Sequence, residues 1–355
     1  MPKNSLLLFA LEHSQVLGNA IAQQLGLALA QHEERVFEDG EHKARPLQSV
    51  RGRSCFVLHS LYGEPSQSVN DKLTRLLFFI ATLKDAAAKD VTAVVPYLAY
   101  ARKDRKTQPR DPVTLRYLAQ LFEAVGTDAL LVLEVHNPAA FQNAFRCSTE
   151  ALDCTSLFAA KLAGQLGDRS HNQSDIHSDI QSDKLGEMRG NRLADAAVVV
   201  VSPDAGGVKR AALFRQKLER SLGRSVTMGF VEKFRSAGVL SGELLVGEVS
   251  GRHVLLFDDL ISSGQTLLRA ARACHQQGAT AVWALAAHGL FNADAESVLS
   301  DPMIERVFIT DSVPLRVTPG SVLANKLEVV SCAALLAEAI RRCHEGGSIV
   351  ELMQG

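Results

Sequence analysis

Short apolar runs alternate with amphipathic segments along most of the chain. A first apolar run at residues 6–9 is followed by an amphipathic segment at 14–25, and residues 70–85 carry apolar side chains at positions 73, 76, 77, 80 and 83. That spacing places the apolar side chains on one face of a helix. Strands that alternate with helices at short intervals predict a doubly wound parallel sheet. The other elements predicted in this half are strands at 54–60, 91–95 and 129–133 and a helix at 113–125.

The second half of the chain repeats this alternation. Residues 254–257 are wholly apolar, which is typical of a strand buried on both faces of a parallel sheet. The residues after 235 contain glycine and serine and resemble a mobile loop that ends near residue 250. Further strands are predicted at 196–201, 226–231, 281–286 and 306–310, and helices at 267–277 and 333–342. The pattern therefore predicts an α/β protein throughout.

Residues 168–190 break the alternation. They are polar and contain a four-residue repeat, Ser-Asp-Ile-His at 174–177 followed by Ser-Asp-Ile-Gln at 178–181. This segment holds too little apolar surface to be buried, so we expect a disordered excursion that is dispensable for folding and activity.

Two acidic residues and a small polar loop follow the buried strand at 254–257. Asp258 and Asp259 are expected where that strand ends, and residues 262–266 form a hydroxyl-rich loop with one glycine ahead of the predicted helix. Open α/β folds bind ligands at the carboxyl ends of their strands. Backbone N–H groups at a helix N-terminus can hold a phosphate, while two carboxylates can hold sugar hydroxyls, directly or through Mg²⁺. A ribose 5-phosphate fits both features, although an ordinary strand-to-helix turn with acidic residues has the same local sequence.

The segment Phe37-Glu38-Asp39-Gly40-Glu41 places an aromatic ring and three carboxylates around a permissive glycine. A solvated acidic turn is one interpretation. In the other, Phe37 stacks on a base while Asp39 or Glu41 accepts a hydrogen bond from the exocyclic amine of that base. The second interpretation suits adenine.

Charged residues also follow other predicted strands. Residues 102–106 hold four cations in five positions, which could neutralise a polyphosphate or form a basic surface loop. His136 follows the strand at 129–133 and is a candidate metal ligand. Asp204 stands beside Gly206-Gly207, which would let the backbone approach a ligand closely, and is a second candidate ligand for a metal or a hydroxyl.

Composition narrows the classes of function. The chain has 355 residues, enough for two domains, with 46% hydrophobic and 22% charged residues and a formal net charge of −1. No overall field would therefore attract nucleic acid or an anionic membrane. No apolar run approaches the roughly 20 residues that span a bilayer, and the N-terminal run is too short for a signal peptide. The six cysteines are scattered and are expected to be reduced thiols of a cytosolic protein, with neither a disulfide framework nor a zinc site.

Taken in order, these motifs resemble those of the ribose-phosphate diphosphokinases, the synthetases of 5-phosphoribosyl 1-diphosphate (PRPP). Simple phosphoribosyltransferases share the motif at 257–266 but lack the motifs of the N-terminal half. The resemblance covers about residues 6–342, apart from 168–190. The motifs that carry it are FEDGE (37–41), PYLAYARKDRK (96–106), EVHNP (134–138), SPDAGG (202–207), EKFR (232–235) and FDDLISSGQT (257–266).

This resemblance implies two similar α/β domains of phosphoribosyltransferase type, at residues 1–155 and 156–325. The segment 326–355 would then carry a helix that packs back on the N-terminal domain. The implied reaction transfers the diphosphoryl group of ATP to the 1-hydroxyl of ribose 5-phosphate, gives AMP and PRPP, and requires Mg²⁺. A cytoplasmic homo-oligomer is expected, with an ATP site shared between subunits and with no nucleic-acid or membrane partner.

The same resemblance assigns roles to individual residues. The catalytic cations would be Lys233 and Arg235 of the mobile loop. The ATP-binding residues would be Phe37, Asp39, Glu41, Arg102, Lys103 and Asp104. The ribose 5-phosphate-binding residues would be Asp204, Asp258, Asp259, Ser262, Ser263, Gly264, Gln265 and Thr266. The metal ligands would be His136 and Asp204.

Several positions depart from the family pattern. Many members have Asp at Glu134, Gln at Lys103 and a third basic residue at Phe234, and an acidic residue and a second glycine where Ser262 and Gln265 stand here. These differences bear on nucleotide preference and allosteric control more than on the reaction. Two alternatives stay open. A catalytically weak regulatory homologue would assemble with an active synthetase, although both loop cations are retained. A phosphoribosyltransferase that consumes PRPP would leave the N-terminal motifs without a purpose.

Overall fold

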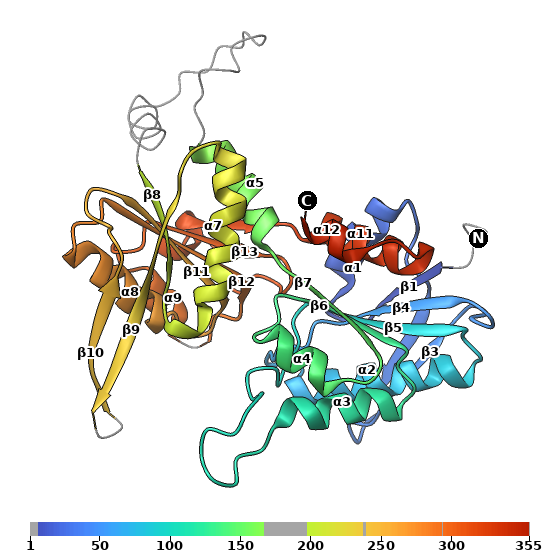
Figure 1. Ribbon diagram of the computed structural model, residues 1–355. Coiled ribbons are helices and arrows are strands. Elements are labelled where there is room, and N and C mark those ends of the chain that lie inside the picture. Colours follow the sequence, from blue (N-terminus) through green and yellow to red (C-terminus); the bar gives the residue numbers. More distant parts are fainter. Residues whose placement is uncertain (1–5, 167–196, 237–238, 293, 355) are drawn as a thin grey trace, which may run out of the picture. The chain divides into compact units, whose positions relative to one another are not determined.

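The computed structural model describes residues 6–166, 197–236, 239–292 and 294–354, which divide into two compact units (Figure 1). The N-terminal unit comprises Met1–Cys154, Asp311–Pro314 and Ser331–Gly355. The C-terminal unit comprises Thr155–Thr310 and Leu315–Val330. The predicted excursion at 168–190 lies outside the described residues. Within the described part, no helix is long and apolar enough to cross a membrane.

The N-terminal unit is built on a five-stranded parallel sheet of order β1-β4-β5-β6-β7. Four of its strands are almost wholly buried, because helices cover both faces and every position must be apolar. In Figure 1, α1 and α11 lie on one face, and α2, α3 and α4 on the other. The strands are Leu6–Ala10, Ser54–Leu58, Asp90–Val95, Ala129–Leu133 and Ser148–Leu152. The helices are α1 (Gln15–Leu25), α2 (Val69–Asp85), α3 (Thr114–Ala124), α4 (Pro138–Ala144), α11 (Ala333–Glu345) and α12 (Ile349–Gln354).

A separate antiparallel hairpin belongs to the same unit. Its strands are β2 (His32–Val36) and β3 (His42–Pro46), and Val36 pairs with His42 at the end nearest the turn. The strand β3 packs against α2, which begins at a capping box formed by Ser68 and Asp71. The FEDGE motif is therefore the turn at the tip of this hairpin.

The C-terminal unit contains a seven-stranded sheet of order β10-β9-β8-β11-β12-β13-β14, parallel except for β10. On one face Phe257 of β11 stacks on Phe214 of α7, with ring centroids 4.5 Å apart, and meets Phe158 of α5 edge-on. The strands are Val198–Ser202 (β8), Thr227–Ser236 (β9), Val239–Val246 (β10), His253–Ile261 (β11), Ala281–Gly289 (β12), Arg306–Thr310 (β13) and Leu327–Val330 (β14). The helices are Thr155–Leu166 (α5), Val208–Leu222 (α7), Gln265–Gln276 (α8), Ala295–Leu299 (α9) and Val322–Lys326 (α10). The predicted α/β class, with mainly parallel sheets flanked by helices, is confirmed.

Two predicted boundaries in this unit are wrong. The segment predicted as a loop after Arg235 contains β10, because β9 continues to Ser236 and pairs with β10 antiparallel across a bulge between Leu240 and Gly242. The strand expected to end before Asp258 continues to Ile261, because β12 goes on pairing with it as far as Gly289. Asp258 and Asp259 are therefore held inside a strand.

Candidate active site

The acidic pair lies on the part of β11 that extends beyond its neighbour β8. Pairing of β11 with β8 ends at Leu256, whereas pairing with β12 continues. Asp259 is buried and Asp258 partly buried. The Nη1 atom of Arg210, near the start of α7, lies 3.7 Å from Asp258 Oδ1 and 3.6 Å from Asp259 Oδ1. The fold thus brings two carboxylates and a guanidinium to the carboxyl edge of the sheet, where open α/β folds bind ligands.

The electrostatics of this pair favour a ligand. Burial raises the pKa of Asp258 well above its usual range, and the neighbouring carboxylate of Asp259 raises it further, while Arg210 acts in the opposite direction. The ionised pair is therefore costly in the protein alone. Hydroxyl donors or a divalent cation would lower that cost, so the pair suits the sugar hydroxyls that the sequence suggests.

The loop after β11 leaves a helix N-terminus open to a ligand. Gly264 precedes α8 in the left-handed conformation, with φ of 76°, and no side chain caps the helix at this position. A Cβ on Gly264 would lie 2.9 Å from Leu299, so both the backbone angle and the packing require glycine. The N–H groups of residues 264–266 can accordingly receive an anion together with the positive end of the helix dipole.

One residue that supports this loop escaped the sequence analysis. Asn292, just after β12, donates from Nδ2 to Ser262 Oγ at 2.9 Å, and its own N–H donates to the Ser262 carbonyl at 3.0 Å. The residue lies 30 positions away in the sequence and belongs to no recognisable motif. Only the parallel pairing of β11 with β12 brings it to the loop.

Asp204 follows β8, the strand adjacent to β11. Its Oδ1 accepts hydrogen bonds from the N–H groups of Gly206 at 3.0 Å and Gly207 at 3.2 Å, which caps the short 3₁₀ helix Ala205–Gly207. That turn leads directly into α7, the helix that carries Arg210. Asp204 therefore shapes the turn that orients Arg210, in addition to any contact it makes with a ligand.

The predicted catalytic cations lie on β9. At the backbone level Lys233 pairs with Glu243, and Arg235 pairs with Leu240. Their side chains lie outside the described part of the chain.

In the N-terminal unit, the FEDGE turn is held by its own hydrogen bonds. The Phe37 N–H donates to the Glu41 carbonyl at 2.8 Å, the Gly40 N–H to the Phe37 carbonyl at 3.0 Å, and the Glu41 N–H to Asp39 Oδ1 at 3.1 Å. The ring of Phe37 is 38% exposed and lies 4.9 Å from the Arg35 guanidinium carbon. An exposed aromatic ring beside a cation can stack on a base.

The basic loop is tied to the turn that carries His136. Asn137 donates from Nδ2 to Asp104 Oδ2 at 2.6 Å, and its Oδ1 caps α4 by accepting from the Ala140 N–H. Arg102 and His136 are both exposed at this place. These contacts bring the 102–106 motif and the 134–138 motif together.

Lys103 is held by a loop contact. Its Nζ donates to Asp111 Oδ2 and to Thr107 Oγ1, and the hydrogen bond from Lys103 is the main reason why the pKa of Asp111 is lowered. Glu134 is buried and accepts from the Cys154 N–H at 2.9 Å, so it anchors the strand end that precedes His136. Asp111 and Cys154 were not singled out from the sequence.

Comparison with known proteins places these motifs in one family. Residues 6–126 match the N-terminal domain of ribose phosphate pyrophosphokinase, and residues 241–354 match the phosphoribosyl synthetase-associated domain. The chain is 35% identical to a ribose-phosphate pyrophosphokinase of Caldanaerobacter subterraneus subsp. tengcongensis, over 98% of each protein. It is 33% identical to ribose-phosphate pyrophosphokinase 1 of Streptococcus pyogenes serotype M1, over 97% of this chain and 96% of that protein.

A solved structure supports the same assignment. The phosphoribosylpyrophosphate synthetase from Mycobacterium smegmatis matches with a TM-score of 0.79 and 30% identity, covering 97% of this chain and all of the other. The two matched domains, the full-length relatives and the shared fold agree with the order of motifs along the sequence. The chain therefore belongs to the ribose-phosphate pyrophosphokinase family of enzymes.

Proposed function

We propose that this protein is an active ribose-phosphate diphosphokinase, which converts ATP and ribose 5-phosphate into AMP and PRPP. The observation that carries the proposal is the pair formed by partly buried Asp258 and buried Asp259, beside the open N-terminus of α8. One feature suits a diol and the other a phosphate. Family membership alone would also fit a weak regulatory homologue, whereas an intact sugar-phosphate site favours an active enzyme.

Ribose 5-phosphate binds in the C-terminal unit in this proposal. The N–H groups of Gly264, Gln265 and Thr266 hold the 5-phosphate, with the hydroxyls of Ser262 and Ser263 beside them. Asp258 and Asp259 accept hydrogen bonds from the ribose hydroxyls. The 1-hydroxyl is left to react, because the phosphate and the two carboxylates fix the sugar at its other positions.

ATP binds through the FEDGE turn and the basic loop. Phe37 stacks on adenine, Asp39 and Glu41 accept from its exocyclic amine, and Arg102 contacts the nucleotide from the basic loop. Lys103 and Asp104 also contact ATP. On binding, Lys103 gives up its contact with Asp111, and Asp104 gives up its contact with Asn137. We further propose a homo-oligomer in which the FEDGE turn completes the ATP site of a neighbouring subunit. The free cysteines suit a reducing cytoplasm.

The Asp204 carboxylate is an oxygen donor of the kind that Mg²⁺ prefers. We assign His136 and Asp204 as ligands of Mg²⁺ or members of its shell. Across the described residues there is no cluster of three or more His, Cys, Asp or Glu that could hold a metal by itself. Mg²⁺ binds through one or two protein groups and the oxygens of phosphates. When bound, the ion supplies neutralisation of charge on the transferring phosphates.

The reaction moves one group. The 1-hydroxyl oxygen of ribose 5-phosphate forms a bond to the β-phosphorus of ATP and gives up its proton to solvent. The bond from that phosphorus to the bridging α,β-oxygen breaks, and AMP leaves with the bridging oxygen. Lys233 and Arg235 stabilise the charge that develops on the phosphate oxygens. Positioning and electrostatic stabilisation dominate such transfers.

The decisive experiment incubates purified protein with ribose 5-phosphate, ATP and Mg²⁺ and resolves AMP, ADP and PRPP by chromatography. Equal amounts of AMP and PRPP are expected. The variant Lys233→Ala should lower kcat by about 10²-fold or more, by analogy with the loss of one oxyanion-stabilising donor. If the wild type alone makes no AMP but assembles with an added active synthetase and changes the activity of that enzyme, the protein is a regulatory homologue. Consumption of PRPP with a base would identify a phosphoribosyltransferase.

A further inference from the structure

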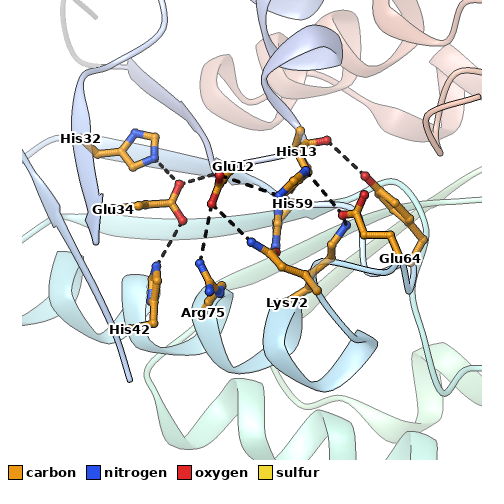
Figure 2. A network of polar contacts seen from close by, with 12 residues as sticks. Glu12, His13, His32, Glu34, His42, His59, Glu64, Lys72 and Arg75 are labelled. Atoms are coloured by element: carbon orange, nitrogen blue, oxygen red, sulfur yellow. Dashed lines mark hydrogen bonds and ion pairs between the residues drawn. The ribbon is translucent and has the colours of Figure 1, made fainter. Parts of the chain in front are cut away.

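A polar cluster lies where the β2–β3 hairpin meets the rest of the N-terminal unit; its hairpin side chains are nearly buried, whereas the Glu12 side chain is 54% exposed. Figure 2 shows Glu34 of β2 facing His32 of the same strand and His42 of β3. Glu12, from the turn between β1 and α1, lies beside them. We call these four residues the hairpin cluster. None of the four belongs to a motif named above or takes part in the proposed reaction.

Three donors converge on the Glu34 carboxylate. Oε1 accepts from the Glu12 N–H at 2.7 Å and contacts His32 Nε2 at 2.9 Å, while Oε2 contacts His42 Nε2 at 3.3 Å. The three side chains of the hairpin are 8–10% exposed. A carboxylate is an acceptor only, so it satisfies all three groups when both histidines carry a proton on Nε2.

The strand register explains why one carboxylate can serve the whole hairpin. His32 and Glu34 are two residues apart and share one face of β2, and Glu34 pairs with Ala44, the residue two positions beyond His42. His42 is therefore the diagonal cross-strand neighbour of Glu34. The carboxylate thus links β2 to β3, and the Glu12 N–H links both to the end of β1.

Neighbouring side chains hold His32 and Glu12, two of the groups that contact Glu34, in place. The ring of His32 packs between Phe9 of β1 at 6.1 Å and Phe79 of α2 at 5.3 Å, centroid to centroid. The Glu12 carboxylate accepts from Gln67 Nε2 at 3.3 Å and lies 3.8 Å from Arg75 of α2. Burial alone would raise the pKa of Glu34, but hydrogen bonds from His32 and the Glu12 N–H outweigh it and lower that pKa to about 2. The carboxylate is thus ionised and firmly held at neutral pH.

Among the described residues, no comparable set of contacts anchors the turn at the other end of the hairpin. The hydrogen bonds of residues 37–41 lie within the turn, and Val36 and Phe37 are 52% and 38% exposed. An isolated two-stranded hairpin is only marginally stable in water. The direction of the turn therefore depends on how the base of the hairpin is attached.

We propose that Glu34 is a positioning residue for nucleotide binding, which fixes the FEDGE turn in the direction that its adenine contact requires. This inference rests on the proposed function, in which Phe37, Asp39 and Glu41 contact ATP. Glu34 lies three residues before Phe37 and touches no substrate. It acts through the turn, by tying both strands of the hairpin to the sheet.

The outer face of the same hairpin supplies a matched control. Glu33 is adjacent to Glu34 but faces outward, where it accepts a hydrogen bond from Arg45 Nε at 2.8 Å. The pair is solvent-exposed and links β2 to β3 without reaching the core sheet. Glu33→Gln thus removes the same charge from the same strand and leaves the anchor intact.

The test compares Glu34→Ala, Glu34→Gln and Glu33→Gln by steady-state kinetics. Glu34→Ala should raise KM for ATP about tenfold or more, the scale of a lost buried charge-assisted hydrogen bond, with kcat and KM for ribose 5-phosphate changed less than about threefold. Glu34→Gln keeps the shape but turns an amide donor toward one of the three donors, so its effect should be intermediate. Glu33→Gln should match the wild type. Equal loss in kcat and in both KM values would mean general damage and would overturn the proposal.

Hydrogen exchange measured by mass spectrometry gives a readout that needs no activity. In Glu34→Ala, the amides of peptides covering 32–46 should exchange at least about tenfold faster, while those of β5 and β6 stay at wild-type rates. If the wild type makes no PRPP but this local loosening occurs, the proposed function fails and the anchoring role stands. If activity is present and the exchange of 32–46 is unchanged, the positioning role fails by itself.

Discussion

Each unit holds carboxylates away from solvent, but donors stabilise the charge in one unit and a second carboxylate opposes it in the other. In the hairpin cluster, three donors surround Glu34, and its pKa is lowered to about 2. On β11, burial and the adjacent Asp259 raise the pKa of Asp258, although Arg210 is near. The first arrangement is complete within the protein, so it holds structure. The second is left costly until a ligand arrives, so it is suited to binding.

This contrast predicts opposite responses to removing a charge, and the largest effect is expected at Asp258. Asp258→Asn removes the repulsion with Asp259, so the urea midpoint at pH 7 should rise or stay constant. The linkage has the same sign: a carboxyl with a raised folded-state pKa favours folding when protonated, and that stability is lost as pH rises through the raised pKa. Activity should nevertheless fall about 10²-fold or more, because an acceptor for the ribose hydroxyls is lost.

Glu34→Gln should instead lower the stability of the protein, and the size of this loss should depend on pH. A carboxylate whose pKa falls from 4.5 to about 2 on folding contributes up to about 3 kcal/mol at neutral pH. That stability is present in full above pH 4.5 and is lost as pH falls through about 2. Urea unfolding at several pH values should therefore show a destabilised variant at pH 7 whose deficit shrinks below pH 4.5. A deficit that is constant down to pH 2.5 would contradict the ionised anchor.

The sequence predicted the sheets better than it predicted the surroundings of Glu34 and of the carboxylate pair on β11. Strands buried on both faces, such as residues 129–133, are continuous apolar runs and were found at their observed bounds. The hairpin strands and β7 are polar or half-buried and have no such signal. The strand β10 was missed because the register that pairs it with β9 includes a bulge and a glycine, which read as a loop.

The site residues divide in the same way. Asp258, Asp259 and the loop at 262–266 are contiguous, so one stretch of sequence indicated a sugar phosphate. The supporting residues are not contiguous. Arg210 and Asn292 reach the site only through the packing of α7 and the pairing of β12. Glu12 and His42 likewise reach Glu34 from two other segments, the turn after β1 and the strand β3.

A smaller effect is expected at Gly264, in the loop that we propose receives the 5-phosphate. Gly264→Ala would place a Cβ 2.9 Å from Leu299 at a φ of 76°. Strain of this kind costs about 1–3 kcal/mol, partly as lost stability and partly as a displaced helix N-terminus. KM for ribose 5-phosphate should rise about tenfold, with KM for ATP nearly constant. The control is Gly223→Ala at the end of α7, which has a φ of 64° but an open Cβ position, so it should affect stability and leave both KM values unchanged.

The smallest effect is expected at Asn292, and it tests whether binding depends on the contact that Asn292 makes with Ser262. Asn292→Ala removes an exposed hydrogen bond to Ser262 Oγ but keeps the backbone bond from residue 292 to the Ser262 carbonyl. One such bond contributes about 1 kcal/mol, so KM for ribose 5-phosphate should rise about three- to fivefold, with the melting temperature unchanged.

Asn292→Asp provides the counterpart, since a carboxylate there can still accept from the serine hydroxyl but places negative charge near the phosphate loop. Its KM should rise more than that of Asn292→Ala, and the excess should shrink at high salt because exposed charges are screened. If the two variants behave alike at low salt, Ser262 does not face the phosphate, and the sugar-phosphate site must be held by Gly264 and the helix N-terminus alone.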